Sequence, residues 1–345
     1  MTALTMPARP EQDESLRPVP WRRMAWVTWR QHRAALAGAA ALLGALAVYL
    51  WLVGLQMHHA YAAATACHPA NSYACGNAVD DFNNTYSPTA EAIAGLLLTV
   101  PALIGVLTGA PVLAREIETG TFQYTWTQGF GRRRWTLAEL VPLAIAVAAA
   151  AGVFSLLFSW YYQPFFTEGN QAPLASAVFG LRGVAFAAWT LAALAIGALA
   201  GMLIRRAVPA IAAALAVYTG LALVVTDFLR PHYLAPLVAR NLFNPPGSAW
   251  LISQWWTKGG MFAFAGNWPS QIVQRQDCPS RSFGPGGLSP GAVVQCLAQH
   301  GYTQWTSYQP ASRFWPFQWI ESGWLLALSV LLITATIWLV RYRAA

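Results

Sequence analysis

Six charged side chains interrupt two long apolar runs in the stretch REIETGTFQYTWTQGFGRRRW at residues 115–135. One arginine and two acids directly follow a long apolar run, and three consecutive arginines directly precede the next: Arg115, Glu116, Glu118, Arg132, Arg133 and Arg134. Carboxylates at the start of a short helix suit the positive end of its dipole and can pair with basic side chains of a partner. Arginines beside an apolar run hold a loop against anionic lipid head groups. The stretch predicts ionic recognition at a membrane surface; the alternative is a plain surface loop whose charges only set topology.

Residues able to catalyse a reaction do not form a familiar arrangement. A phosphate-binding loop needs Gly-Lys-Ser/Thr, but the single lysine, Lys258, lies in the sequence WTKGG. The metalloprotease pattern HExxH is absent from the sequence. We therefore expect that the chain is not an enzyme and that it has no catalytic or cofactor-binding residue.

Imidazoles and carboxylates are also metal ligands. His58, His59 and His68 lie near Asp80 and Asp81 in the sequence. No spacing among them fixes a ligand geometry, and histidine at the junction of a helix and a loop is ordinary. We expect no metal-binding residue.

The composition is that of a membrane protein. Of the 345 residues, 56% are hydrophobic and 10% are charged, and the mean hydropathy is +0.41; a soluble domain carries about 25% charged residues. The net charge of +8 would suggest nucleic acid in a soluble protein. Here the basic residues flank apolar runs, as the positive-inside rule requires. No basic patch accompanies a nucleic-acid-binding pattern, so we expect no nucleic-acid partner.

A helix needs about 20 predominantly apolar residues to cross a bilayer. Six stretches meet this length: 34–55, 91–113, 138–162, 177–204, 208–229 and 322–340. Gly105 with Gly109, and Gly197 with Gly201, form two small-xxx-small pairs, a pattern typical of close helix packing in membranes. The predicted fold class is an all-α polytopic membrane protein with six transmembrane helices.

The basic residues also predict the orientation of the chain. Fourteen of the 21 Lys and Arg residues lie in four segments that the positive-inside rule assigns to the cytoplasm: 1–33, 114–137, 205–206 and 341–345. The loops 56–90 and 163–176 contain none. We therefore expect both termini in the cytoplasm. The first apolar run is too long for the core of a signal peptide, so we expect a retained helix.

The four cysteines agree with this topology, because all lie in segments predicted to be outside the cell, where disulfides persist. They are Cys67, Cys75, Cys278 and Cys296. We expect the disulfides Cys67–Cys75 and Cys278–Cys296, since each closes a short loop within one segment. Four unpaired thiols are the alternative.

Two segments lie before the first span. Residues 1–20 are proline-rich and polar, and we expect a disordered cytoplasmic tail. Residues 21–33, WRRMAWVTWRQHR, gather arginines on one side of a helical wheel and tryptophans mostly on the other. This pattern predicts an amphipathic helix in the membrane interface; a cytoplasmic extension of the first span is the alternative.

Two features lie on the outer side. Residues 230–321 are long for a connection and predict a small extracellular domain, containing the Cys278–Cys296 disulfide, before the last helix. Arg182 and Asp227 both lie toward the outer ends of their helices. We expect them to pair, either as a structural salt bridge or as a gate on a substrate path.

The stretch 115–135 resembles the loop between the second and third helices of ABC-2-type permeases, the membrane subunits of many bacterial ABC exporters. An Arg-Glu-x-Glu-x-Gly-Thr run leaves the second helix in that family, and a basic turn leads into the third. The residues that match are Arg115, Glu116, Glu118, Gly120 and Thr121, followed by Arg132, Arg133 and Arg134. The family often has a lysine at the start of the third helix, where this chain has Glu139.

The resemblance implies a type V ABC exporter fold in a bacterial cell membrane. Two copies of the chain would pair across a central path, and each would dock a separate ATPase through residues 115–137, so that MgATP is hydrolysed in the partner. The cargo expected is a hydrophobic or amphipathic compound such as a drug, lipid or peptide. The resemblance also implies re-entrant or membrane-surface helices within residues 247–268. Two roles are open for residues 230–321: a lid or docking site, and a structural cap. The alternative function is a membrane-anchored sensor or scaffold that binds an extracellular ligand through residues 230–321.

Overall fold

The structure is a computed structural model that describes residues 21–68, 73–119, 132–167, 171–241, 248–266 and 290–343. The predicted disordered tail, residues 1–20, lies outside the described residues. Among the described residues, six helical segments are long and apolar enough to cross a membrane, which confirms the six predicted spans: Ala40–Thr65, Tyr73–Arg115, Thr136–Tyr161, Ala185–Ile204, Ala207–His232 and Ala311–Tyr342.

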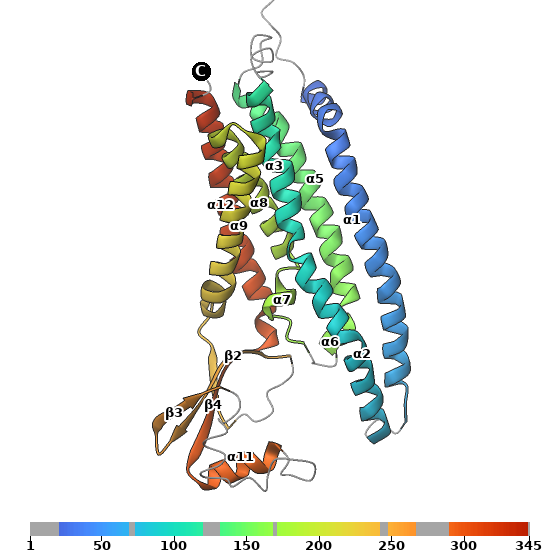
Figure 1. Cartoon of the computed structure of the whole chain (residues 1–345), viewed down its shortest axis with the longest axis vertical. Coiled ribbons are helices and arrows are strands. Elements are labelled where there is room, and N and C mark those ends of the chain that lie inside the picture. Colours follow the sequence, from blue (N-terminus) through green and yellow to red (C-terminus); the bar gives the residue numbers. More distant parts are fainter. Residues whose placement is uncertain are drawn as a thin grey trace, which may run out of the picture.

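Figure 1 shows these helices side by side in one bundle, with the C-terminus and the start of α1 at one end and a small sheet at the other. The main helices, in chain order, are α1 (Trp21–Thr65), α2 (Tyr73–Leu97), α3 (Val100–Thr119), α5 (Arg132–Tyr161), α8 (Ala185–Ile204), α9 (Ala207–Val224) and α12 (Phe314–Arg343). Helix α8 lies in the middle of the bundle, where it packs on α3, α5, α9 and α12. It is apolar around its whole circumference, as a helix enclosed by others must be.

The first two spans are longer than hydropathy predicts. Helix α1 runs without a break from Trp21 to Thr65, so residues 21–33 are the start of α1 and not a separate interfacial helix. The predicted loop 56–90 is wrong, because α1 and α2 extend through most of it. Asp80 and Asp81 lie on the exposed surface of α2. Polar residues of this kind lower the hydropathy of a segment without preventing helix formation.

A short break separates α2 from α3 within the second span. Pro101 has no N–H, so it cannot bond to the carbonyl of Leu97, and α2 ends at that residue. The hydroxyl of Thr99 donates to the carbonyl of Leu96 at 2.7 Å, which satisfies one of the backbone groups left at the break. Helix α3 then starts at Val100 in a slightly changed direction (Figure 1).

The two predicted small-residue pairs pack against each other, where α3 crosses α8. A Cβ added to Gly109 would lie 2.4 Å from the carbonyl oxygen of Leu194, and one added to Gly201 would lie 2.4 Å from the carbonyl oxygen of Ala110. Gly105 and Gly197 are comparably close to the opposite backbone. Dispersion contacts between closely spaced backbones stabilise helix pairs in lipid, where the hydrophobic effect does not drive association. This contact fixes α8 to α3.

The segment after α9 forms a four-stranded antiparallel sheet with the strand order β1-β4-β2-β3. Its strands are β1 (Leu237–Arg240), β2 (Trp250–Lys258), β3 (Met261–Ala265) and β4 (Tyr302–Gln309), and α11 (Pro290–Gln299) packs beside β4. The prediction of an all-α chain is therefore wrong here, as is the prediction of re-entrant or surface helices within residues 247–268. β2 and β3 form a hairpin because Gly259 and Gly260, both at positive φ, supply the two-residue turn.

The sheet has a small core of its own and is joined firmly to the bundle. Trp256 and Leu297 are buried against each other with Tyr302. At the other end of β4, the side-chain amide of Gln309 donates to the carbonyl of Leu234 at 2.7 Å, and Arg313 donates to the carbonyl of Ala235 at 2.7 Å. β4 therefore continues into α12 while held to the segment that follows α9.

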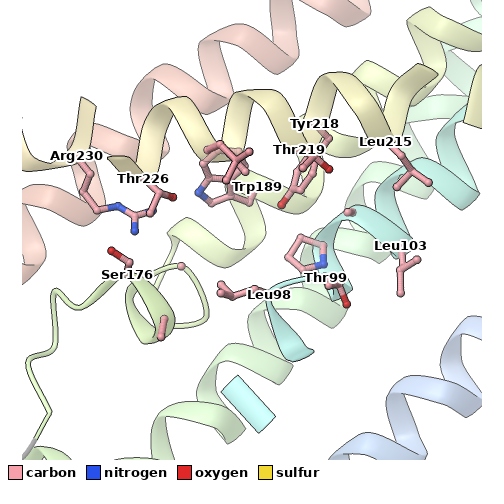
Figure 2. Close-up of a pocket in the computed structure, with 16 residues that line it drawn as sticks. Leu98, Thr99, Leu103, Ser176, Trp189, Leu215, Tyr218, Thr219, Thr226 and Arg230 are labelled. Atoms are coloured by element: carbon pink, nitrogen blue, oxygen red, sulfur yellow. The ribbon is translucent and has the colours of Figure 1, made fainter. Parts of the chain in front are cut away.

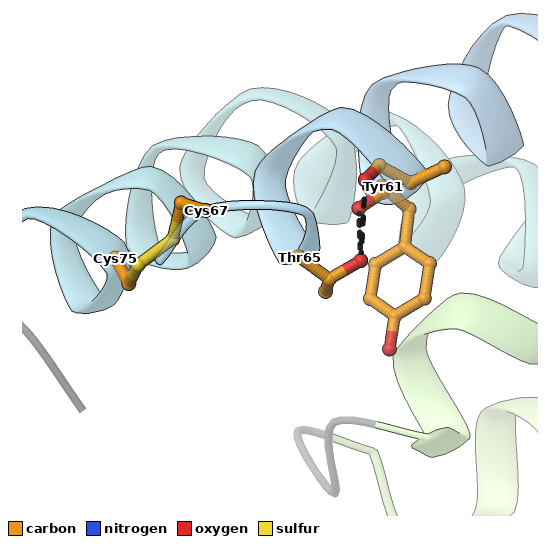
Figure 3. Close-up of a disulfide and its surroundings, with 5 residues drawn as sticks. Tyr61, Thr65, Cys67 and Cys75 are labelled. Carbon is orange, nitrogen blue, oxygen red and sulfur yellow. Dashed lines mark hydrogen bonds between the residues drawn. A yellow bond between two sulfur atoms is a disulfide. The ribbon is translucent and has the colours of Figure 1, made fainter. Parts of the chain in front are cut away.

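A disulfide joins Cys67, just after α1, to Cys75, in the first turn of α2 (Figure 3), which confirms that pairing. Cys296 is also disulfide-bonded. Cys278, its predicted partner, lies outside the described residues.

The Gly–Gly contact predicts that Gly109→Ala lowers the free energy of unfolding by about 1–3 kcal/mol, because the new methyl group has to push α8 away from α3. The midpoint of thermal unfolding of the purified chain measures this. Gly220→Ala is the matched control, since nothing lies within 4 Å of a Cβ added there. We expect it to leave stability unchanged or to raise it by up to about 1 kcal/mol. Equal effects of the two substitutions would contradict the contact.

The predicted orientation places the Cys67–Cys75 disulfide outside the cell. In intact cells, a membrane-impermeant maleimide is expected to label these cysteines only after treatment with an impermeant reductant. A cysteine placed at Arg206, in the α8–α9 turn at the opposite end of the bundle, is expected to react only after permeabilisation, when tested in a Cys67→Ser, Cys75→Ser chain. The reverse pattern would show that the orientation is inverted.

Candidate functional site

A buried ion pair joins the end of α9 to α12. Glu321, on α12, is 0% exposed in its side chain, and Arg230, in the short 3-10 helix η2 (Arg230–His232), is 3% exposed. Nε of Arg230 donates to Oε2 of Glu321 at 2.9 Å, and Nη2 donates to Oε1 at 2.8 Å. The indole N–H of Trp189, on α8, donates to the same Oε1 at 2.7 Å. This carboxylate of α12 thus contacts two other helical elements, η2 and α8.

Glu321 can reach both partners because the helices beside it are irregular at this level of the bundle: α9 ends here and α8 begins here. α9 passes into a π-helical turn, η1 (Val225–Leu229), and then into η2, where Arg230 lies. α8 begins only at Ala185, so the predicted span 177–204 is interrupted between the short helix α7 (Ser176–Phe179) and α8. Gly183 adopts a φ of +62° in this interruption.

Gln318, one turn of α12 before Glu321, makes hydrogen bonds to the backbone groups that are left free between α7 and α8. Its Oε1 accepts from the amide of Ala185 at 2.9 Å, and its Nε2 donates to the carbonyl of Phe179 at 3.1 Å. A Cβ at Gly183 would lie 2.7 Å from Oε1 of Gln318. Ser155 of α5 donates to the carbonyl of Gly183 at 3.0 Å. Buried backbone groups that leave a helix need such partners, since lipid offers none.

A pocket of about 660 Å³ lies beside this polar cluster, between α9 and the α2–α3 break. Trp189 lies along it, and Arg230 closes one end together with Thr226 and Ser176, while Leu215 and Leu103 lie toward the other end (Figure 2). The remaining lining is mostly apolar. The volume and the lining, apolar with a few polar groups at one end, are typical of small-molecule sites.

The structure does not bring the predicted pair Arg182 and Asp227 together. The guanidinium of Arg182 lies over the ring of Phe166 at 3.9 Å and over the ring of Phe314 at 4.9 Å from its carbon to the centroids. Burial lowers the pKa of Arg182 to about 10, which leaves it a cation at neutral pH. Asp227 is exposed on η1. The ion pair that the structure does contain at this depth, Arg230–Glu321, was not predicted.

The opposite end of the bundle carries the charged stretch 115–135. Arg115 is exposed at the end of α3, and Arg132, Arg133 and Arg134 start α5. Gly120 and Thr121 lie outside the described residues, and the Glu116 side chain is likewise not described. The end of α3 and the start of α5 lie at the same end of the bundle as the α8–α9 turn and the end of α12 (Figure 1). The described parts of the predicted cytoplasmic segments therefore lie together.

Glu118 has a contact that the sequence did not predict. Its Oε2 accepts from the amide of Ala207, the first residue of α9, at 3.2 Å. The preceding residue, Arg206, makes no side-chain cap of its own. A carboxylate at a helix N-terminus satisfies a free N–H and complements the dipole. Glu118 therefore ties the end of α3, where the charged stretch begins, to the start of α9, which lines the pocket.

The histidines near Asp80 and Asp81 do not assemble a metal site among the residues that the structure describes, where no group of three ligand side chains is found. His58 instead stacks on Trp160, with ring centroids 4.7 Å apart. Its Nε2 lies 3.0 Å from the carbonyl oxygen of Trp160. This residue fastens α1 to α5.

The six apolar helices, with charged residues at one end of the bundle, are those of a multi-pass membrane protein. A family model described as ABC-2 membrane transporter related matches residues 40–230, more than half of the chain. The chain belongs to this family. It is a multi-pass membrane protein and a permease of the ABC transporter type. Neither a curated protein nor a solved structure matches the chain.

The matched range of this permease contains the stretch 115–135, the α2–α3 break and all of α9 up to Arg230. It ends before the sheet and α12, so Gln318 and Glu321 lie beyond it. Arg230 is thus the last matched residue, and its counter-charge comes from outside the matched range.

The ion pair predicts that Arg230→Met destabilises the permease by about 3–5 kcal/mol, because it leaves the Glu321 carboxylate buried without a counter-charge. The double variant Arg230→Met, Glu321→Gln is expected to recover most of this loss, since a glutamine oxygen can still accept from Trp189. The shift in thermal unfolding midpoint of the purified chain measures both.

Asp227→Asn serves as the control, because that carboxylate is exposed. We expect no measurable change in its unfolding midpoint. A double variant as unstable as Arg230→Met alone would contradict the account of the pair.

Proposed function

We propose that the chain is the membrane subunit of an ATP-driven exporter in a bacterial cell membrane. Two copies pair to form the path, and each docks a separate ATPase subunit through residues 115–137, where MgATP is hydrolysed by the partner. The cargo is a hydrophobic or amphipathic compound. The match of residues 40–230 to the ABC-2 family carries this proposal, because members of that family work with an ABC ATPase.

The arrangement of charged groups supports docking at this end of the bundle. The stretch 115–135 lies between α3 and α5 in the chain. Its first residues, from Arg115 to Thr121, resemble the ABC-2 motif position by position, and Arg132–Arg134 occupy the place of the later basic turn. Arg115 and Arg134 are both exposed. A partner that binds here can contact the end of α3 and the start of α5, so its movements reach the bundle directly.

The contact of Glu118 with Ala207 supplies a route from the docking stretch to the pocket. A displacement of the end of α3 moves the N-terminus of α9, and α9 lines the pocket with Leu215 and Tyr218. The other end of α9 is held by Arg230 and Glu321. We propose that α9 is the element whose movement opens and closes the pocket during transport.

Docking through the charged stretch predicts that Glu116→Lys abolishes co-purification of the ATPase, because it reverses a charge of the proposed docking motif. Affinity purification from the native membrane, followed by identification of the retained ATPase by its ATP hydrolysis, measures this. Asp80→Lys is the matched control: it reverses an exposed charge at the other end of the bundle. We expect that variant to retain the ATPase. Retention by both variants would refute docking at this stretch.

The capping role predicts a different result for Glu118→Ala. The ATPase is expected to remain bound, because Glu116 and the arginines of the docking stretch are kept, while transport falls and ATP hydrolysis by the complex becomes less dependent on cargo. Loss of a helix cap costs about 0.5–2 kcal/mol, which shifts the unfolding midpoint only modestly. Glu118→Gln keeps an acceptor oxygen and is expected to restore part of the coupling. If Glu118→Ala releases the ATPase as Glu116→Lys does, then Glu118 acts in docking rather than through α9.

A further inference from the structure

The pocket contains hydrogen-bonding groups that nothing in the described part of the chain uses. Nη1 of Arg230 is buried and has no partner, although Nε and Nη2 of the same side chain are bonded to Glu321. The hydroxyls of Thr226 and Ser176, which lie at the same end of the pocket (Figure 2), make no hydrogen bond within the described residues either. Elsewhere in the bundle, comparable hydroxyls bond to the carbonyl of the preceding turn, as Thr108 and Thr190 do.

A buried polar group without a partner, such as Nη1 of Arg230, is costly and is therefore expected to meet a ligand or water. The half-buried hydroxyls of Thr226 and Ser176 lie with it at one end of a site whose other walls are mostly apolar. Leu103 and Leu223, which also line the pocket, are 39% and 59% exposed. A molecule with one polar end and an apolar body therefore matches the lining, with its polar end placed next to Arg230.

The charge of that polar end follows from the ion pair. The positive charge of Arg230 is already balanced by Glu321, which lies at 2.8 Å and is fully buried. An anion at Nη1 would bring a second negative charge into this enclosed region without a counter-charge, and a cation would be repelled by the guanidinium. An uncharged oxygen, in a hydroxyl, ester or amide, accepts the free N–H without either cost.

We propose that this pocket binds an uncharged amphipathic molecule, whose head-group oxygen accepts a hydrogen bond from Arg230 and whose apolar body lies along α9 and Trp189. That this molecule is the cargo rests on the proposed transport function. That the pocket binds it does not. Binding itself needs no ATPase, so it is measured on the permease alone.

Three photoreactive probes with the same dodecyl chain test the charge preference: one ends in a hydroxyl, one in a sulfonate and one in a trimethylammonium group. The full chain in lipid nanodiscs is irradiated with each, and labelled peptides are quantified by mass spectrometry. We expect the hydroxyl probe to label the lining segments of α3 and α9 at least about tenfold more than either charged probe. Equal labelling by the three probes, or a preference for the sulfonate, would overturn the proposal.

Two substitutions test whether Glu321 and Thr226 cause the preference for the uncharged probe. Glu321→Gln leaves Arg230 as an unbalanced cation, so we expect the ratio of sulfonate to hydroxyl labelling to rise at least about tenfold. Thr226→Val removes a free hydroxyl with little change of shape and is expected to reduce hydroxyl-probe labelling about two- to tenfold. Thr334→Val, on the exposed surface of α12, is its control and should leave labelling unchanged. Unchanged labelling in both Glu321→Gln and Thr226→Val would place the probe elsewhere and refute the site.

The source of the molecule is distinguished by competition. A neutral diacylglycerol that displaces the hydroxyl probe identifies a membrane lipid as the occupant, whereas displacement only by a water-soluble neutral amphiphile identifies a solute. Both outcomes support an uncharged amphipath, and displacement by neither contradicts it. Failure of the chain to retain an ATPase would refute the transport function and leave these labelling results standing.

Discussion

The buried carboxylate of Glu321 is the group on which the half of the bundle next to the sheet depends. It accepts from Arg230 and from Trp189, and so it joins α12 to the end of α9 and to the start of α8. A charge held so far from water requires a counter-charge and complete hydrogen bonding, and removing either partner costs several kcal/mol. This requirement explains why the elements around it are irregular: η2 places Arg230, and the break before α8 leaves room for Gln318.

The same arrangement makes the pocket. α8 is fixed to α3 by glycines at the crossing, and it is fixed to α12 by Trp189. α9 packs on α8 and α3 along one face, where Ala210, Ala214 and Tyr218 are buried, and it exposes Val217 and Leu223. Polar contacts are added at both ends, because Glu118 bonds to Ala207 and Arg230 anchors the turn that follows α9. One end of α9 adjoins the stretch that resembles the ATPase-docking loop of ABC-2 permeases.

Much of the membrane-spanning architecture follows from hydropathy and charge. The predicted span 138–162 agrees closely with the observed Thr136–Tyr161, because the apolar run starts directly after three arginines and ends at a polar segment. The Cys67–Cys75 disulfide was predicted for a similar reason, since a short loop brings the two residues together. Hydropathy did not predict the extension of α1 and α2 beyond the apolar region, because it detects lipid-facing residues and not the ends of helices.

The sheet and the buried cluster were missed for different reasons. WLISQWWTK is rich in β-branched and aromatic residues and is followed by Gly-Gly, a hairpin signal that was available in the sequence. The pairing of Arg230 with Glu321 was not available, because the two residues are 91 positions apart and Glu321 was placed at the edge of a span starting at 322. Its helix starts eight residues earlier, at Phe314, which carries Glu321 into the protein interior.

Hydrogen exchange in the purified chain tests most directly whether Glu321 holds these elements together. In Glu321→Ala, the account predicts faster exchange both in residues 183–189, before and at the start of α8, and in residues 225–233, at the end of α9. Residues 190–201, which lie along α3, should stay protected. Faster exchange in only one of the two regions, or equally throughout α8, would contradict the claim that one carboxylate joins them.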